Sequence, residues 1–283
     1  MHRPSLPEAG IPAGGGGLPE PERSQALATS APLPDATARA IDPEALSLQE
    51  LEALMQPLAA SDPLVRAYMR RMQALLQRRA ELLRSLLALR AQGRVAFVDL
   101  EATCYRDREE SKRLPREILE IGLAVLDCGS LQVVERLQLH VRPADPRSYV
   151  SAYCTELTGI RPEQVAQAPG FAECMQAVRK LHARHRWTSW GSYGDFDRQQ
   201  LAQQALASGC ENPFSAWTHV DVKDIAGAYF GFGRKGPGLA RAVAMAGLAF
   251  DGRQHSGLDD ACNTASLVAA MLRGILPDEA RRG

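Results

Sequence analysis

A continuous apolar run, Val95–Val98, is followed directly by two acidic residues, Asp99 and Glu101. An apolar stretch of this kind is typical of a central β-strand that is covered on both faces. Residues two apart on a strand point to the same side, so the two carboxylates should project together where the strand ends. Because the ends of central strands line crevices in α/β proteins, we expect an acidic site at this edge of a sheet.

The segments that follow indicate a mixed sheet. Residues 117–127 and 131–141 are predicted to be two further strands joined by a short turn at 128–130, which gives an antiparallel meander with the first strand. Strand and helix patterns then alternate, beginning with a strand over 186–193 and a helix over 196–209. The sequence therefore predicts an α/β fold with a mixed five-stranded sheet flanked by helices.

The region before this sheet is predicted to be partly helical. Residues 1–42 are rich in Pro, Gly and Ala and are expected to be disordered. Ser47 and Glu50 match a capping box, so a short helix should run from there to about residue 60. The expected boundaries are a helical extension over 43–93, a compact domain over 94–273 and a C-terminal tail over 274–283.

A second, longer helix is expected over residues 63–92. Its apolar residues have the alternating three- and four-residue spacing of a coiled-coil seam, broken at Arg79. The seam consists of Val65, Tyr68, Met72, Leu75, Leu82, Leu86 and Leu89. It would either pack on the compact domain or pair with a second copy, which makes 63–92 a possible site of homo-oligomerisation. Arginines crowd the polar side, and they either face water, which is the usual role of a charge run, or contact phosphates.

The composition limits the cellular compartments and the binding partners that we expect. Lys plus Arg and Asp plus Glu number 33 each, so any attraction for nucleic acid must come from local charge. The six cysteines include no C-x-x-C pair, which argues against a disulfide framework or a zinc knuckle. No apolar run approaches the ~20 residues of a membrane span, and the start lacks a signal-peptide core. We therefore expect a cytoplasmic protein without a membrane partner.

Further acidic residues lie at predicted helix starts. Asp197 opens a helix after an apolar strand, and it is favoured over Asp195 because it shares a helical side with Leu201. His255 and Asp260 lie five residues apart at the start of the last helix. Four carboxylates in one place repel each other unless cations lie between them. The set therefore indicates a two-metal phosphodiesterase site.

Together these motifs resemble the DEDDh 3′–5′ exonucleases of the ribonuclease H-like superfamily. The D-x-E, D and H-x-x-x-x-D pattern carries the resemblance, along with the strings FVDLEATC, REILEIG, YCTELTGI, SWGSYGDFDRQQL and DGRQHSGLDDACNTA. These strings are similar to the branch that includes the histone-mRNA 3′-end exonuclease and its bacterial relatives. The resemblance covers about residues 94–273, and it implies a ribonuclease H-like fold and exonuclease activity.

The resemblance also implies individual roles. Two Mg²⁺ or Mn²⁺ ions would be held by Asp99, Glu101, Asp197 and Asp260. His255 would be the general base. The terminal nucleotide would contact Leu100, Ala102, Tyr153 and Leu157, although ordinary core packing also explains the last two. The implied substrate is the 3′ end of single-stranded RNA, with proofreading-type DNA hydrolysis or a non-catalytic nucleic-acid-binding role on the same fold as alternatives.

A charged segment, residues 106–116, separates the first two predicted strands. It is long enough and charged enough to guide a substrate. It also has the composition of a solvated insertion, and that interpretation is favoured here.

Overall fold

The computed structural model describes residues 47–232 and 236–275. The tail predicted to be disordered, residues 1–42, lies outside these ranges, as do residues 276–283. The chain divides into two compact units, Met1–Leu58 and Ala59–Gly283. The sheet and its flanking helices belong to the second unit.

The two helices of the extension begin where the sequence predicts. Helix α1 spans Leu48–Ser61, and its capping box is present because Ser47 N–H donates to Glu50 Oε2 at 2.8 Å and Glu50 N–H donates to Ser47 Oγ at 3.3 Å. Helix α2 spans Pro63–Arg90 and starts at Asp62, whose side chain accepts hydrogen bonds from the first turn.

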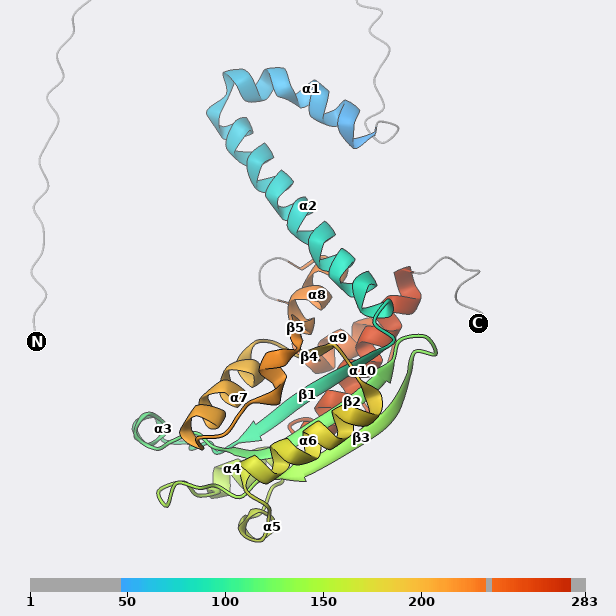
Figure 1. Ribbon diagram of the computed structural model, residues 1–283. Helices are drawn as coiled ribbons and strands as arrows, with labels where there is room; N and C mark the ends of the chain where they lie inside the picture. The colour runs from blue at the N-terminus through green and yellow to red at the C-terminus, as the bar shows by residue number, and fades with distance from the viewer. Residues whose placement is uncertain (1–46, 233–235, 276–283) are drawn as a thin grey trace, which may run out of the picture. The chain divides into compact units, whose positions relative to one another are not determined.

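The second unit is built on a mixed five-stranded sheet with the strand order β3-β2-β1-β4-β5 (Figure 1). β1 pairs antiparallel with β2 and parallel with β4, so it is the central strand that the apolar run predicts. The strands are β1 (Arg94–Ala102), β2 (Ile118–Asp127), β3 (Gln132–His140), β4 (Ser189–Ser192) and β5 (Thr218–Asp221). The predicted fold class is confirmed.

Helices fill the connections between strands. They are α3 (Arg108–Arg113), α4 (Ala152–Thr158), α5 (Pro162–Ala166), α6 (Phe171–His185), α7 (Phe196–Ala207), the 3-10 helix η1 (Pro213–Ala216), α8 (Val222–Tyr229), α9 (Leu239–Met245) and α10 (Gly257–Ile275). α3, α4 and η1 are absent from the sequence prediction. α10 also continues two residues past the predicted domain end at 273. Among the described helices, none has the length and apolarity needed to cross a bilayer.

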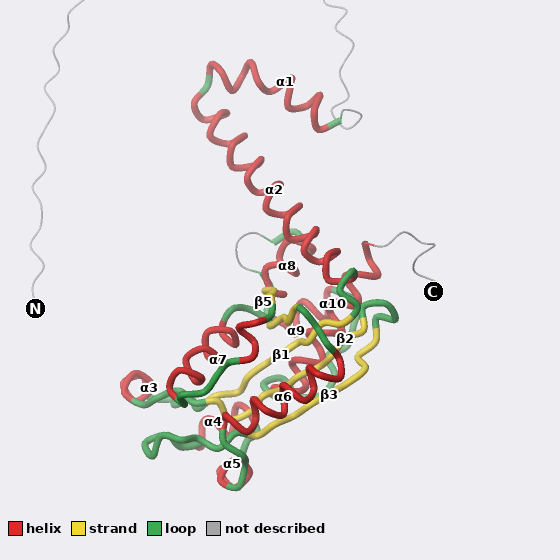
Figure 2. The backbone as a smooth tube through the Cα atoms, viewed as in Figure 1, coloured by secondary structure: helices red, strands yellow, loops and turns green. Residues whose placement is uncertain are grey.

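The sheet separates two apolar cores. Val95 and Phe97 of β1 face one core together with α8 and α10, and the alternating residues Ala96 and Val98 face the other core with α6. Figure 2 shows α6 and α7 on one side of the sheet and α10 on the other. Coverage of both faces explains why the β1 run is continuously apolar.

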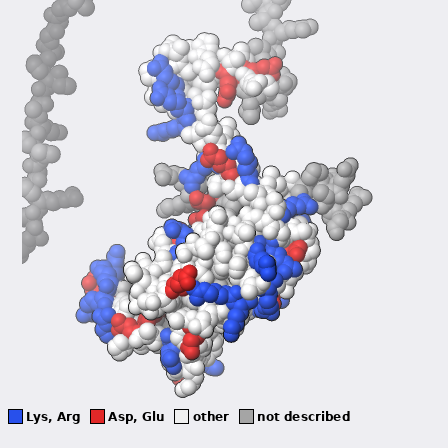
Figure 3. Space-filling model, viewed as in Figure 1, with Lys and Arg blue, Asp and Glu red and all other residues white. Residues whose placement is uncertain are grey.

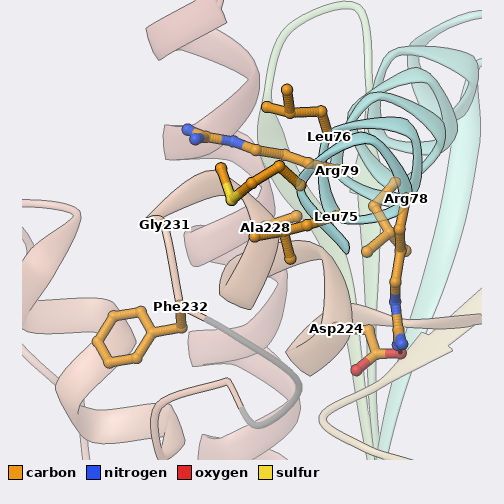
Figure 4. Close-up of a pocket in the computed structure, with 10 residues that line it drawn as sticks. Leu75, Leu76, Arg78, Arg79, Asp224, Ala228, Gly231 and Phe232 are labelled. Atoms are coloured by element: carbon orange, nitrogen blue, oxygen red, sulfur yellow. Dashed lines mark hydrogen bonds and ion pairs between the residues drawn. The ribbon is translucent and has the colours of Figure 1, made fainter. Parts of the chain in front are cut away.

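The seam of α2 is only partly covered. Leu86 and Leu89 are fully buried in the α10-side core, whereas Tyr68 is 62% exposed and Leu75 is 47% exposed. Arg78 forms an ion pair with Asp224 of α8 at 2.8 Å. Figure 4 shows the apolar recess beside this pair, in which α2 faces α8 and the chain that follows it. The C-terminal end of the seam thus packs on the compact domain, which is one of the two arrangements that the sequence predicts.

Candidate active site

Asp99 and Glu101 lie near the carboxyl end of β1, on the side of the sheet that α10 covers. Glu101 is only 8% exposed. The pairing of β1 with β2 shifts register between Glu101 and Ala102, a kind of irregularity that often re-aims side chains next to active sites. Among the described residues, no donor hydrogen-bonds to either carboxylate. Both therefore have acceptor oxygens free for another ligand.

Asp197 joins this pair from the first turn of α7. It is 4% exposed, and its Oδ1 accepts a hydrogen bond from the Leu100 backbone N–H at 2.9 Å. Its neighbour Asp195 instead pairs on the surface with Arg198, whose Nη2 lies 2.8 Å from Asp195 Oδ2. Asp195 occupies the N-cap position but makes no side-chain cap hydrogen bond. The structure thus brings Asp197 to the pair and leaves Asp195 outside.

Asp260 and His255 come from the start of α10. The His255 backbone N–H donates to Asp260 Oδ2 at 3.1 Å, and His255 adopts a left-handed conformation with φ 62°. One ligand atom each from Glu101, His255 and Asp260 lies within 4.8 Å of the others. The neighbouring Asp259 accepts from the Arg253 N–H and so holds the preceding loop.

The electrostatics of the four carboxylates follow from burial and mutual repulsion. Burial raises the pKa of Glu101 to about 8, that of Asp197 to about 7 and that of Asp260 to about 6. Burial also raises the pKa of Asp99 well above its ordinary value, and the charges of Asp197, Asp260 and Glu101 raise it further. Without a cation, the cluster holds protons at neutral pH.

The donor set fits divalent cations. The group that could hold an ion consists of carboxylate oxygens and one imidazole. Among the described residues, no Lys or Arg side chain forms an ion pair with the four carboxylates. Hard cations such as Mg²⁺ and Mn²⁺ prefer oxygen ligands of this type. A cation here would offset both the repulsion and the burial of charge. The apolar recess of Figure 4 contains none of these five residues and is a separate feature.

Glu120 is an acidic residue of this region to which sequence reasoning gave no role. It is 2% exposed on β2, and its Oε1 accepts from Leu258 N–H at 3.0 Å and from Gln138 Nε2 at 3.0 Å. Its negative charge contributes to the raised pKa values of Asp99 and Glu101. The sequence feature that could have identified Glu120 is that it is a charged residue inside an otherwise apolar strand.

The four predicted substrate contacts lie around the same strand end. Leu100 and Ala102 are buried, and the Leu100 N–H is already committed to Asp197. Tyr153 and Leu157 are half-buried on α4 and belong to none of the described apolar cores. Core packing therefore does not explain them.

Comparison with known proteins agrees with this geometry. The sequence profile of the exonuclease family RNase_T matches residues 96–268. The chain belongs to this exonuclease family. The match spans the strand end, α7 and the start of α10, and thus every residue of the carboxylate cluster.

Individual relatives of this chain are named as exonucleases. It is 27% identical to the Rattus norvegicus protein "3'-5' exoribonuclease 1" over 186 residues, which are 63% of this chain and 53% of that protein. It is also 27% identical to the Drosophila melanogaster "3'-5' exonuclease Snipper" over 213 residues, 66% of this chain and 72% of that one. The chain therefore spans about half the length of the rat relative.

A solved structure is similar in fold and sequence. The nuclease domain of 3'hExo, described as a DEDDh family member bound to rAMP, aligns with a TM-score of 0.60 and 26% identity. The alignment covers 65% of this chain and 94% of that one. The predicted resemblance to DEDDh exonucleases is confirmed.

Proposed function

We propose that this protein is a metal-dependent 3′–5′ exonuclease that degrades single-stranded RNA to nucleoside 5′-monophosphates. The observation that supports this most is the convergence of four carboxylates and one imidazole, from three distant segments, at the end of β1. When ionised, the four carboxylates repel one another unless cations lie between them, and phosphodiester hydrolysis is a chemistry that such paired cations serve.

In this proposal Asp99, Glu101, Asp197 and Asp260 hold two divalent cations. When bound, the cations supply charge that offsets the developing negative charge on the phosphate. Asp197 is oriented by the Leu100 N–H, and Asp260 by the His255 N–H. The positive ends of α7 and α10 lie beside Asp197 and Asp260 and favour both carboxylates.

His255 is the proposed general base, because its imidazole is exposed next to Glu101 and Asp260. A water oxygen bonds to the phosphorus of the terminal phosphodiester, and the water proton passes to the imidazole. The bond from phosphorus to the 3′ oxygen of the penultimate nucleotide breaks, and that oxygen takes a proton from solvent. The products are a nucleoside 5′-monophosphate and a strand that is one nucleotide shorter.

We propose RNA rather than DNA as the substrate, because the similar rat protein is named an exoribonuclease and the similar solved nuclease domain is bound to rAMP. The half-buried Tyr153 and Leu157 on α4 are proposed to border the terminal base. Stacking of a base on an aromatic ring contributes ~1–3 kcal/mol and tolerates any base.

The test uses the full chain with 5′-labelled single-stranded RNA and DNA of matched sequence, in Mg²⁺, Mn²⁺ or EDTA. A ladder that shortens from the 3′ end, in metal only and faster on RNA, is the expected result. Faster shortening of DNA would favour the proofreading-type alternative. Binding without shortening in every metal would favour a non-catalytic nucleic-acid-binding protein.

A further inference from the structure

The charged segment between β1 and β2 is a folded and anchored insertion. Thr103 N–H donates to Glu117 O at 2.8 Å, and Thr103 Oγ1 donates to Pro115 O at 3.2 Å, so the two ends of the insertion are tied together. The Glu117 carboxylate accepts from the backbone N–H groups of Ala144 and Asp145. Between these ends lies α3. The insertion is solvated, as predicted, because most of its residues are exposed, but it is folded and anchored at both ends.

Two arginines of the insertion lie over aromatic rings beside the candidate active site. The Arg106 guanidinium is 5.2 Å from the ring centre of Tyr153, and that of Arg116 is 5.5 Å from the ring centre of Phe196. Phe196 is 43% exposed and directly precedes Asp197. Figure 3 shows Lys and Arg atoms gathered over α3. The insertion therefore brings positive charge to the border of an acidic cluster.

Arg116 lies against a ring and, unlike Arg106 and Lys112, has no acidic partner among the described residues. Its guanidinium makes no hydrogen bond or salt bridge with any residue of the described ranges, although its backbone carbonyl is fixed by Gln200 Nε2 at 2.9 Å. Lys112 by contrast pairs with Glu109, and Arg106 pairs with Glu156 across an exposed contact of 3.0 Å. Exposed pairs of this kind contribute little and exchange easily.

A guanidinium that lies over a ring keeps its in-plane N–H donors free. These donors match two oxygens of a phosphate at once, which a lysine ammonium cannot do. An unpaired arginine fixed against Phe196, one residue from Asp197, thus has the geometry of a phosphate clamp. Arg106 can bind a phosphate in the same way, because its exposed contact with Glu156 is easily exchanged. We assign it the secondary contact.

We infer that Arg116, assisted by Arg106, binds a backbone phosphate of the single strand whose 3′ end lies at the carboxylates. The inference rests on the proposed function for the position of the strand. The ligand is a phosphodiester backbone, which these arginines would bind whatever the base. Because the net charge of the chain is zero, this local clamp supplies the attraction that the whole molecule does not.

The test compares Arg116→Gln with Arg108→Gln in the full chain. Both substitutions remove one positive charge. Arg108 serves as the control because it is exposed on the same insertion and lies over none of the described rings. Fluorescence anisotropy of a labelled single-stranded oligonucleotide in EDTA gives the Kd. We expect Arg116→Gln to weaken binding about tenfold or more and Arg108→Gln less than ~2-fold. The slope of log affinity against log salt should become shallower by ~0.7 for Arg116→Gln alone.

Arg116→Lys keeps the charge without the planar fork, so its loss should lie between wild type and Arg116→Gln. Thermal unfolding of each variant establishes that the fold is retained. Equal effects of Arg116→Gln and Arg108→Gln, or no effect of either, would overturn the clamp. Wild type that binds the oligonucleotide in EDTA but never shortens it in Mg²⁺ or Mn²⁺ refutes the proposed function and still tests the clamp. Wild type that fails to bind it in EDTA refutes the clamp, and hydrolysis in Mg²⁺ or Mn²⁺ then tests the proposed function separately.

Discussion

Glu120 Oε1 accepts a hydrogen bond from the Leu258 backbone N–H at 3.0 Å, which ties β2 to the first turn of α10. The helix can approach so closely because Gly122 lies beneath it, where an added Cβ would be 2.0 Å from the Gly257 carbonyl carbon. Asp260 lies two residues beyond Leu258. The position of one candidate metal ligand is therefore set by a buried acid on a neighbouring strand.

Removing that tie should weaken metal binding. Glu120→Ala leaves the Leu258 N–H without its acceptor and frees the start of α10, so the Mg²⁺ concentration for half-maximal hydrolysis should rise ~10–100-fold. Glu120→Gln keeps an acceptor oxygen and should have a much smaller effect. Titration of activity with Mg²⁺ on labelled RNA makes the comparison. Equal behaviour of the two variants would show that the hydrogen bond does not position Asp260.

The two aspartates at the start of α7 give a matched pair. Asp197→Asn removes a buried carboxylate beside Asp99 and should lower turnover at least ~100-fold, since a metal ligand contributes several kcal/mol to catalysis. Asp195→Asn removes a surface carboxylate that pairs with Arg198 and accepts from Gln199 Nε2, so it should change turnover less than ~2-fold. Single-turnover hydrolysis of labelled RNA measures both. The reverse order would exchange the roles assigned to the two residues.

Most of the site could be predicted because its signals are local. A buried strand that ends in D-x-E and an aspartate in line with the buried Leu201 each follow from periodicity. The tie from Glu120 to Leu258 joins residues 138 apart in sequence, and no local pattern encodes it. Sequence periodicity likewise gives the apolar side of α2 but not what covers it.

Helix α3 was missed for a different reason. Its sequence, REESKR, has no apolar stripe, so the 3.6-residue period is absent. The helix forms because Asp107 caps it and because Ser111 Oγ donates to Tyr105 O at 2.9 Å. Such capping and tertiary contacts become visible only in the folded chain.

The cluster should make the metal-free protein less stable as pH rises. The folded-state pKa values of Glu101 and Asp197, about 8 and 7, exceed those of an unfolded chain, so the native state binds more protons. This stabilisation is complete below about pH 4 and is lost as pH rises through 7 and 8. In EDTA, the free energy of unfolding from urea titrations should therefore fall between pH 6.5 and 8.5. The comparison starts at 6.5 because the lowered pKa of His219, about 4, acts in the opposite direction below that.

Two controls isolate the cluster. Asp99→Asn removes one repelling charge and should flatten the pH dependence between pH 6.5 and 8.5. Mg²⁺ or Mn²⁺ should restore stability most at pH 8.5, where the carboxylates are ionised. Stability that rises with pH in EDTA, in wild type and variant alike, would contradict the assigned electrostatics.

The seam of α2 is buried at one end and exposed at the other, so two of its leucines should contribute differently to the free energy of unfolding. Leu86 is fully buried against the sheet, so Leu86→Ala should cost about 2–5 kcal/mol of the free energy of unfolding. Leu75 is 47% exposed at the recess of Figure 4, so Leu75→Ala should cost under about 1 kcal/mol if the protein is monomeric. Urea unfolding at two protein concentrations tenfold apart separates packing from pairing. If Leu75→Ala destabilises strongly, and only at the higher concentration, the exposed end of the seam pairs with a second copy, because only an association has a stability that depends on protein concentration.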